Sequence, residues 1–329
     1  MSSCVPDTSY FATPEFLSLA LHCMSVIEIP INSFGAWMIV YHTPPTMSSV
    51  KWPMLHFHFW CSFLDISVSL LGMPYMLLPE IAGFGLGLLT KLGVSSRFQV
   101  HAYLTVVGSV YANRYYVLVG GHWSQLWKTI WWISFVFMWL VASTCMIPFT
   151  LMVPEQAEAV KTIFSRLPCL PTYVYEGPVF VYLLDVTTAI STISVLVAIV
   201  VLIVVTLIVL TLIKLIQQAL SGTFSKKTLS LQKRFLLGLT IHTSIPFIVG
   251  IIPVCYLVIT VPLQYYNQAF NNFSFILFSF HGPLSTIAML LIYQPYRHAT
   301  RNIILSLFGK NKVFMRRKSV SNNTGNRNI

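Results

Sequence analysis

The chain has 329 residues and a mean hydropathy of +0.73, with 56% hydrophobic and only 9% charged residues. An ordinary soluble domain has about a quarter of its residues charged, so this composition excludes that class. It predicts an all-α polytopic membrane protein, even though the formal net charge is +11.

Charge-poor runs predict the membrane spans, because a helix needs about 20 residues to cross about 30 Å of hydrocarbon. The clear runs are 16–41, 52–78, 129–152, 186–213 and 235–296, the last of which is long enough for two spans. Pro74 is expected to kink the second run. The polar residues 264–272 are expected to form the turn between the last two spans.

The segment between Arg97 and Arg114 is short for a span. Residues 98–113 would reach only about 24 Å at 1.5 Å per residue, less than the hydrocarbon core. A helix that continues to Val119 has 22 residues, and Arg114 then lies in its last two turns, with its side chain extended toward the interface. Such a span is strained but possible, so the length of the segment leaves open both six crossings and a seven-transmembrane helix bundle.

The positions of basic residues do not decide between seven and six spans. Seven spans place sixteen of the twenty lysines and arginines on the inner side, and six spans place seventeen there. Acidic residues favour seven, because six spans would bring Asp7, Glu15 and Glu80 inside. The alternative is a six-span channel or carrier with both termini cytoplasmic, which would use Asp65 and Glu28 in a conduction or proton path.

Three acids lie in or beside predicted spans. A charged Asp65 near the centre of the second span would cost about 2.5–3.5 kcal/mol, so it should face a polar interior or be protonated. There it would hold water or an ion between helices, or serve as a neutral, hydrogen-bonded packing residue. Glu28, two residues before Pro30, and Asp185, at the start of the fifth span, are candidates to line an outward-facing ligand cavity.

No pattern predicts a metal site, a cofactor or catalysis. His56 and His58 are two residues apart, which turns their rings about 200° from each other on a helix, so we expect interfacial histidines. Cys4 and Cys169 are the cysteines on the outer side of the seven-span arrangement and could pair. The chain has no Walker loop, nucleophile elbow or HExxH motif, and we expect neither an enzyme nor a nucleic-acid partner.

A basic loop, 214–234, lies in the cytoplasm in both topologies. Four of its basic residues are the candidates to face a partner: Lys226, Lys227, Lys233 and Arg234. They would meet an acidic protein surface, or they reflect only the general excess of positive charge on the inner side.

The C-terminal residues predict a helix followed by a disordered tail. Arg297 and Arg301 are four residues apart among apolar residues at helical spacing, so 297–309 should form an amphipathic helix on the anionic inner leaflet of the bilayer. The tail 310–329 is polar and basic enough to be disordered. Within it, Ser319 follows three basic residues, as in a basic-directed phosphorylation site.

Eight stretches of the chain, in order, carry a resemblance to a known family. They are FGAWMIVYHTPPTMSSVKW (34–52), LHFHFWCSFLDISVS (55–69), AGFGLGLL (82–89), NRYYVL (113–118), LPCLP (167–171), LQKRF (231–235), YYNQAFNN (265–272) and HGPLSTIAMLLIYQPYR (281–297). Together they resemble the nematode serpentine receptors of class H, which are chemoreceptors related to G-protein-coupled receptors. Compared with that family, the third span is shortened.

The resemblance implies a receptor of the plasma membrane, with an extracellular N-terminus over 1–15, a seven-span bundle over 16–296 and a cytoplasmic C-terminus. It also implies an unknown small-molecule ligand and a heterotrimeric G protein as partners. Asn113, Arg114 and Tyr115 take the place of the charged triplet that ends the third helix in many such receptors, where the arginine can act as a switch. The alternative is an ordinary basic residue at a helix end.

Overall fold

The computed structural model describes residues 8–100, 151–185 except Pro168, and 259–307, together with scattered positions between these ranges. Within these ranges, three helical segments are long and apolar enough to cross a membrane: Pro14–His42, Met54–Gly72 and Gln268–Ile292. They correspond to the first, second and last predicted spans. The predictions for the triplet 113–115, the loop 214–234, Cys4 and Ser319 lie outside the described residues, as does nearly all of the third span.

The first span is helix α1 (Pro14–His42), which begins with several helix-start signals. Thr13 Oγ1 accepts a hydrogen bond from Phe16 N (3.2 Å), and Pro14 occupies the first helical position. Glu15 lies in the first turn, where a negative charge favours the helix dipole. The helix continues through Pro30, which has no N–H to bond the preceding turn.

The second span consists of α2 (Ser48–Ile66) and a π-helical turn, η3 (Ser67–Gly72). Met73 then adopts a left-handed conformation (φ 46°), and Pro74 is the first residue of strand β1 (Pro74–Met76). The prediction that Pro74 kinks this span is therefore wrong. The helix has already ended, because the chain changes direction at Met73.

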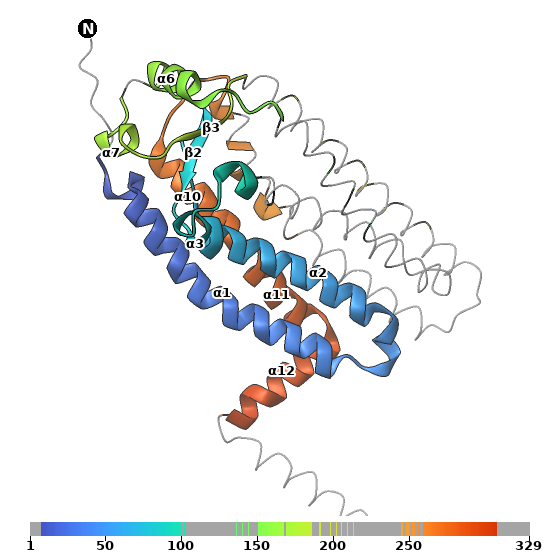
Figure 1. Cartoon of the computed structure of the whole chain (residues 1–329). Helices are drawn as coiled ribbons and strands as arrows, with labels where there is room; N and C mark the ends of the chain where they lie inside the picture. The colour runs from blue at the N-terminus through green and yellow to red at the C-terminus, as the bar shows by residue number, and fades with distance from the viewer. Residues whose placement is uncertain are drawn as a thin grey trace, which may run out of the picture.

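A small antiparallel sheet, which the sequence patterns did not predict, lies at one end of the helices. Its strand order is β1, β2 (Ile81–Gly85) and β3 (Phe180–Leu183), with Tyr75 paired to Phe84. Two helices, α6 (Gln156–Arg166) and α7 (Thr172–Tyr175), accompany it. We call strands β1–β3 with α6 and α7 the cap. Figure 1 shows the cap beside the start of α1, at the opposite end from α12.

One hydrophobic cluster joins the cap to the start of α1. Its buried members include Leu17, Leu21, Tyr75, Phe84, Ile163, Val174 and Val181. Tyr75 also donates a hydrogen bond from its hydroxyl to Ala12 O (2.7 Å), and burial raises the pKa of Tyr75, which keeps that proton in place. Gln156 holds α6 to the sheet, since its side-chain amide bonds both Val181 N (2.9 Å) and Val181 O (3.1 Å).

The last span is divided into α10 (Gln268–Ser279) and α11 (His281–Ile292), with the break at Phe280. The turn before α10 ends at Asn267, whose side chain caps the helix by accepting from Phe270 N (3.0 Å). Residues 268–272, which we expected in the turn, therefore belong to α10. Within the described ranges, α1 packs against α2, α10 and α11.

Helix α12 (Gln294–Leu307) follows α11 directly and includes most of the predicted amphipathic segment. Tyr296 is fully buried, and its Oη lies 2.7 Å from Thr43 Oγ1, just beyond the end of α1. A second hydrophobic cluster surrounds this contact: Met38, Ile39, Met54, Met289, Leu290, Tyr293 and Tyr296. This cluster fixes where α12 leaves the bundle (Figure 1).

Candidate functional site: a polar layer inside the bundle

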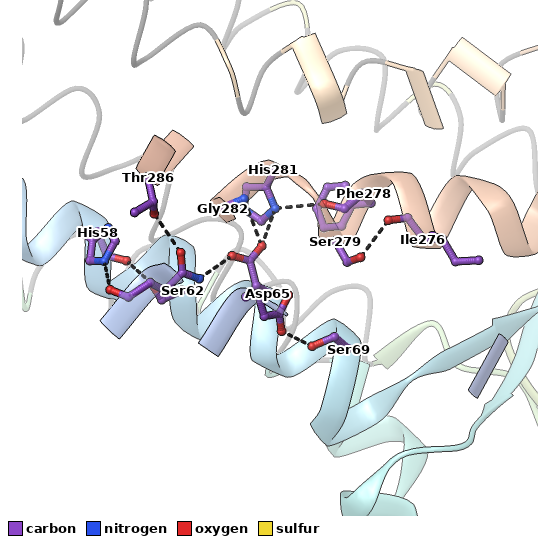
Figure 2. A network of polar contacts seen from close by, with 12 residues as sticks. His58, Ser62, Asp65, Ser69, Ile276, Phe278, Ser279, His281, Gly282 and Thr286 are labelled. Atoms are coloured by element: carbon purple, nitrogen blue, oxygen red, sulfur yellow. Dashed lines mark hydrogen bonds and ion pairs between the residues drawn. The ribbon is translucent and has the colours of Figure 1, made fainter. Parts of the chain in front are cut away.

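Polar side chains meet where α1, α2 with η3, and α11 face one another, between the two hydrophobic clusters. We call this group the polar layer, and its members are Glu28, Asn32, Asp65, Ser69, His281 and Thr286. All six are buried, at 4% exposure or less. Figure 2 shows the part of this layer around Asp65.

Asp65 is at the centre of the layer and accepts three hydrogen bonds. Its Oδ1 lies 2.7 Å from His281 Nδ1 and 3.3 Å from Gly282 N, and its Oδ2 accepts from Asn32 Nδ2 at 3.2 Å. His281 Nδ1 also lies 3.0 Å from Phe278 O, and a carbonyl oxygen can only accept, so this nitrogen carries a proton. The carboxylate therefore lies in a polar interior, and its predicted part in ligand binding stays a prediction.

The contact with Gly282 places Asp65 at the start of α11. Phe280, the residue before this helix, offers no side-chain cap of its own. Leu284 N bonds Phe280 O (3.1 Å) and Pro283 has no N–H, whereas Gly282 N bonds Asp65 of the neighbouring helix, where the helix dipole also favours a negative charge. Gly282 makes this approach possible, because a Cβ at that position would overlap Asp65 Oδ2.

Asn32 joins the three helices. Its Oδ1 accepts from Thr286 Oγ1 (2.8 Å) on α11, and its backbone carbonyl accepts from His58 Nε2 (2.7 Å) on α2. His58 is therefore buried, and the prediction that it lies at the membrane interface is wrong. Gly35 makes room for the ring, because a Cβ there would lie 2.8 Å from His58 Cε1.

Glu28 forms the part of the layer nearest the cap. Its Oε1 accepts a hydrogen bond from Ser69 Oγ, which in turn lies 3.0 Å from Ser25 Oγ. Glu28 is fully buried, whereas Asp185, just after β3, is exposed. The structure thus brings Glu28 and Asp65 into one layer and leaves Asp185 apart from them. Their proposed roles toward a ligand stay predictions.

Buried amide side chains connect the cap to the first turns of α10. Gln268 Nε2 donates to Met76 O (3.1 Å) and Asn271 Nδ2 donates to Leu78 O (3.0 Å), both of which belong to the chain around β1. Asn272 Nδ2 donates to Phe11 O (2.9 Å). The first two amides bond carbonyl groups in and just after β1, so they hold α10 to the cap, and Asn272 holds α10 to the turn before α1.

An ion pair and a disulfide also belong to the cap. Glu80, with a side chain only 2% exposed, pairs with Arg166 Nη1 at 3.2 Å, and the same nitrogen donates to Leu184 O (3.1 Å). Cys169 is disulfide-bonded, and its partner lies outside the described residues. The pairing of Cys169 with Cys4 stays a prediction. Among the residues that the structure describes, no three His, Cys, Asp or Glu side chains come together as metal ligands.

Sequence reasoning identified Asp65 but missed its partners. His281 follows Asp65 by 216 positions, and Asn32 precedes it by 33. The available signal was polarity: His281, Gly282, Ser285 and Thr286 interrupt an otherwise apolar span at intervals that share one helix face. This pattern indicates a polar face on the last span, but it does not identify the residues that the face contacts.

The family model for the serpentine type 7TM GPCR chemoreceptor Srh matches residues 12–306. The chain belongs to this family. It is also 25% identical over 334 residues to serpentine receptor class H-72 of Caenorhabditis elegans, which covers 94% of this chain and 91% of that protein. Membership in Srh confirms the predicted helical, multi-pass membrane architecture and the resemblance to class H receptors. It does not favour the six-span channel or carrier.

Proposed function

We propose that this Srh-family chain is a chemosensory receptor that binds a small organic molecule and activates a heterotrimeric G protein. The family match over 12–306 is the observation that carries the proposal. The N-terminus then lies outside and the C-terminus in the cytoplasm, which places the cap on the outer face and α12 at the inner one. The unidentified ligand reaches the chain from the cap side.

The polar layer supports a signalling role more directly than a ligand-contacting one. A buried carboxylate that caps a helix start and pairs with an imidazole is costly to break, so it favours one arrangement of the helices. In the proposed receptor, Asp65 and Glu28 respond to ligand through the helices that hold them. Asp185, at the exposed side of the cap, remains a candidate for first contact with the ligand.

The α12 end has the features of a membrane-surface helix. Arg297, Arg301, Ile304 and Leu307 are all exposed, so the helix presents both basic and apolar side chains. We propose that its apolar side chains enter the acyl boundary of the inner leaflet and that its arginines contact anionic headgroups. The G protein would meet this end through Lys226, Lys227, Lys233 and Arg234.

Two further residue proposals concern regulation. We propose that Arg114, between Asn113 and Tyr115, is released from a resting contact when the receptor is activated. We also propose that phosphorylation of Ser319 reverses the charge of the basic tail and weakens its contact with anionic lipid or a partner.

Accessible tags test the orientation. Epitope tags are placed at each terminus of the full-length chain, and antibody binding is compared on intact and permeabilised cells. The proposal expects the N-terminal tag to bind antibody on intact cells and the C-terminal tag to do so only after permeabilisation. Both tags inaccessible on intact cells would contradict the seven-span receptor.

A second experiment tests coupling to a G protein. The full-length chain in lipid nanodiscs is mixed with purified heterotrimers of each Gα class, and GTPγS binding is measured. We expect one class to show accelerated binding. The matched variant with alanine at Lys226, Lys227, Lys233 and Arg234 should lose that effect while keeping surface expression. No acceleration with any class would contradict the proposed signalling.

A further inference from the structure

Each of the described spans departs from regular α-helical geometry at the polar layer. In α1, Pro30 lies between Glu28 and Asn32, the two residues that this helix contributes. In the second span, the π-helical turn η3 begins at Ser67, two residues after Asp65. The last span breaks at Phe280, one residue before His281. Prolines and π-helical turns are common causes of kinks in long helices.

The contacts Ser25–Ser69, Asn32–Asp65 and Asp65–Gly282 place these three irregular points at one level of the bundle. A single kink would be an adjustment of one helix. At this one level, all three spans depart from the regular pattern of α-helical hydrogen bonds.

The packing of α1 and of the last span divides at the same level, while a third cluster on the second span continues past it: Phe57, Cys61, Leu64 and Val68, with Phe278 packed against them. Leu17 and Leu21 of α1 belong to the hydrophobic cluster that joins the cap to α1. Phe275 and Ile276 of α10 pack against the same cluster. Beyond the layer, Met38 and Ile39 of α1 pack with Met289 and Leu290 of α11 in the other cluster. Both long spans therefore contribute their two halves to different clusters. The amide hydrogen bonds of Gln268, Asn271 and Asn272 attach α10 firmly to the cap side.

We infer that the polar layer is a hinge: the cap with α10 moves as one body against α11, α12 and the second half of α1. The Asp65 carboxylate on the first turn of α11 is the latch that holds one setting of this hinge. When the latch is made, Gly282 N, His281 Nδ1 and Asn32 Nδ2 share one acceptor group. When it opens, α10 and α11 are free to change their relative direction. Its part in signalling rests on the proposed function.

The expected displacement is large enough to measure. Phe273 lies seven residues before Phe280, or about 10 Å along α10, so a swing of roughly 15° moves it by about 3 Å. Phe273 on α10 and Leu291 on α11 are exposed, lie 18 residues apart and so share one helix face. Tyr41 is exposed near the end of α1, in the same proposed body as Leu291. The Tyr41–Leu291 distance therefore serves as the reference that the hinge should not change.

Distance measurements between nitroxide labels test the hinge in the full-length chain in phosphatidylcholine nanodiscs. The labels are attached through introduced ketone-bearing residues, which avoids the native cysteines. In the unaltered chain, where the latch is made, we expect narrow distance distributions for both Phe273–Leu291 and Tyr41–Leu291. A Phe273–Leu291 distribution that stays equally narrow when the latch is removed would overturn the inference.

Two variants act on the latch. Gly282→Ala forces Asp65 away from α11, and Asp65→Ala removes the acceptor of its three hydrogen bonds. Each should broaden the Phe273–Leu291 distribution and shift it by up to about 3 Å, and leave Tyr41–Leu291 unchanged. Leu284→Ala, on an exposed position of the same helix, should change neither distance. If Gly282→Ala disturbs both distances, Asp65→Ala decides the matter. An unchanged Phe273–Leu291 distance in Asp65→Ala would overturn the inference.

These distances need neither a ligand nor a G protein. A chain that shows the hinge but never accelerates GTPγS binding would refute the proposed signalling and leave the hinge intact. A chain that couples to a G protein but keeps the same Phe273–Leu291 distance when the latch is removed would refute the hinge and leave the proposed signalling intact.

Discussion

Replacing Asp65 with alanine should destabilise the folded chain strongly, because it removes the acceptor of three buried donors. Of these donors, His281 Nδ1 keeps Phe278 O at 3.0 Å as a second partner. Asn32 Nδ2 and Gly282 N have Asp65 as their acceptor and would be left without it. An unsatisfied buried donor costs about 1–3 kcal/mol. Two such donors would cost about 2–6 kcal/mol, with a midpoint of about 4 kcal/mol.

Thermal unfolding in lipid nanodiscs, followed by far-ultraviolet circular dichroism, measures this loss. At about 2.1 cal/mol/K per residue, the unfolding entropy of the 329 residues is about 0.7 kcal/mol/K, so a loss of about 4 kcal/mol should lower Tm by roughly 6 °C. Asp65→Asn keeps an acceptor oxygen, so it should lose less than half as much. Glu158→Ala is the matched control, because its side chain is 75% exposed and its ion pair with Lys161 (3.1 Å) should contribute less than about 1 kcal/mol.

A double-mutant cycle then isolates the contact with the imidazole. Asp65→Ala and His281→Ala share that contact, so their combined loss should be smaller than the sum of the single losses by about 1–3 kcal/mol. If Asp65→Ala unfolds within about 1 °C of the parent, the loss is under about 1 kcal/mol, and Asp65 is not the acceptor on which these donors depend. Single losses that simply add would refute the contact between Asp65 and His281.

The remaining predictions concern other contacts. In Gly35→Val, the added Cβ would lie 2.5 Å from Thr286 Cγ2, so α1 and α11 must separate. We expect the free energy of unfolding to fall by about 1–3 kcal/mol in the same assay. An unchanged Tm would contradict the close packing. Arg166→Ala leaves the buried carboxylate of Glu80 without its ion-pair partner. Limited proteolysis should then cut the 151–185 segment faster, and Arg166→Lys should give an intermediate rate. Equal rates would show that the pair does not hold the cap. Asn272 is the first residue of an Asn-Phe-Ser sequon, but it is 1% exposed and donates to Phe11 O. Glycosidase treatment should therefore not change the electrophoretic mobility of the expressed chain. A mobility shift that Asn272→Gln abolishes would refute the burial of Asn272.

The spans were predictable from the sequence because hydropathy is a local property. A run of apolar residues with Thr13 and Pro14 at its start specifies a helix whatever lies beside it, and α1 matches the predicted run at 16–41 within two residues at each end. For the same reason, the cost of a charge in hydrocarbon pointed to a polar surrounding for Asp65. The cap sheet was not predictable in this way, since β1 has only three residues and no alternation that distinguishes it from a loop.

The sequence by itself determined where apolar helices run, that Asp65 needs a polar interior and that the chain resembles class H serpentine receptors. Only the tertiary structure decided which groups satisfy Asp65, that Glu28 shares its layer while Asp185 does not, and that Pro74 begins a strand. The reason is the range of the interactions. Insertion into a bilayer depends on the composition of each segment, whereas a buried carboxylate is stabilised by donors that folding brings from distant positions, here Asn32, His281 and Gly282.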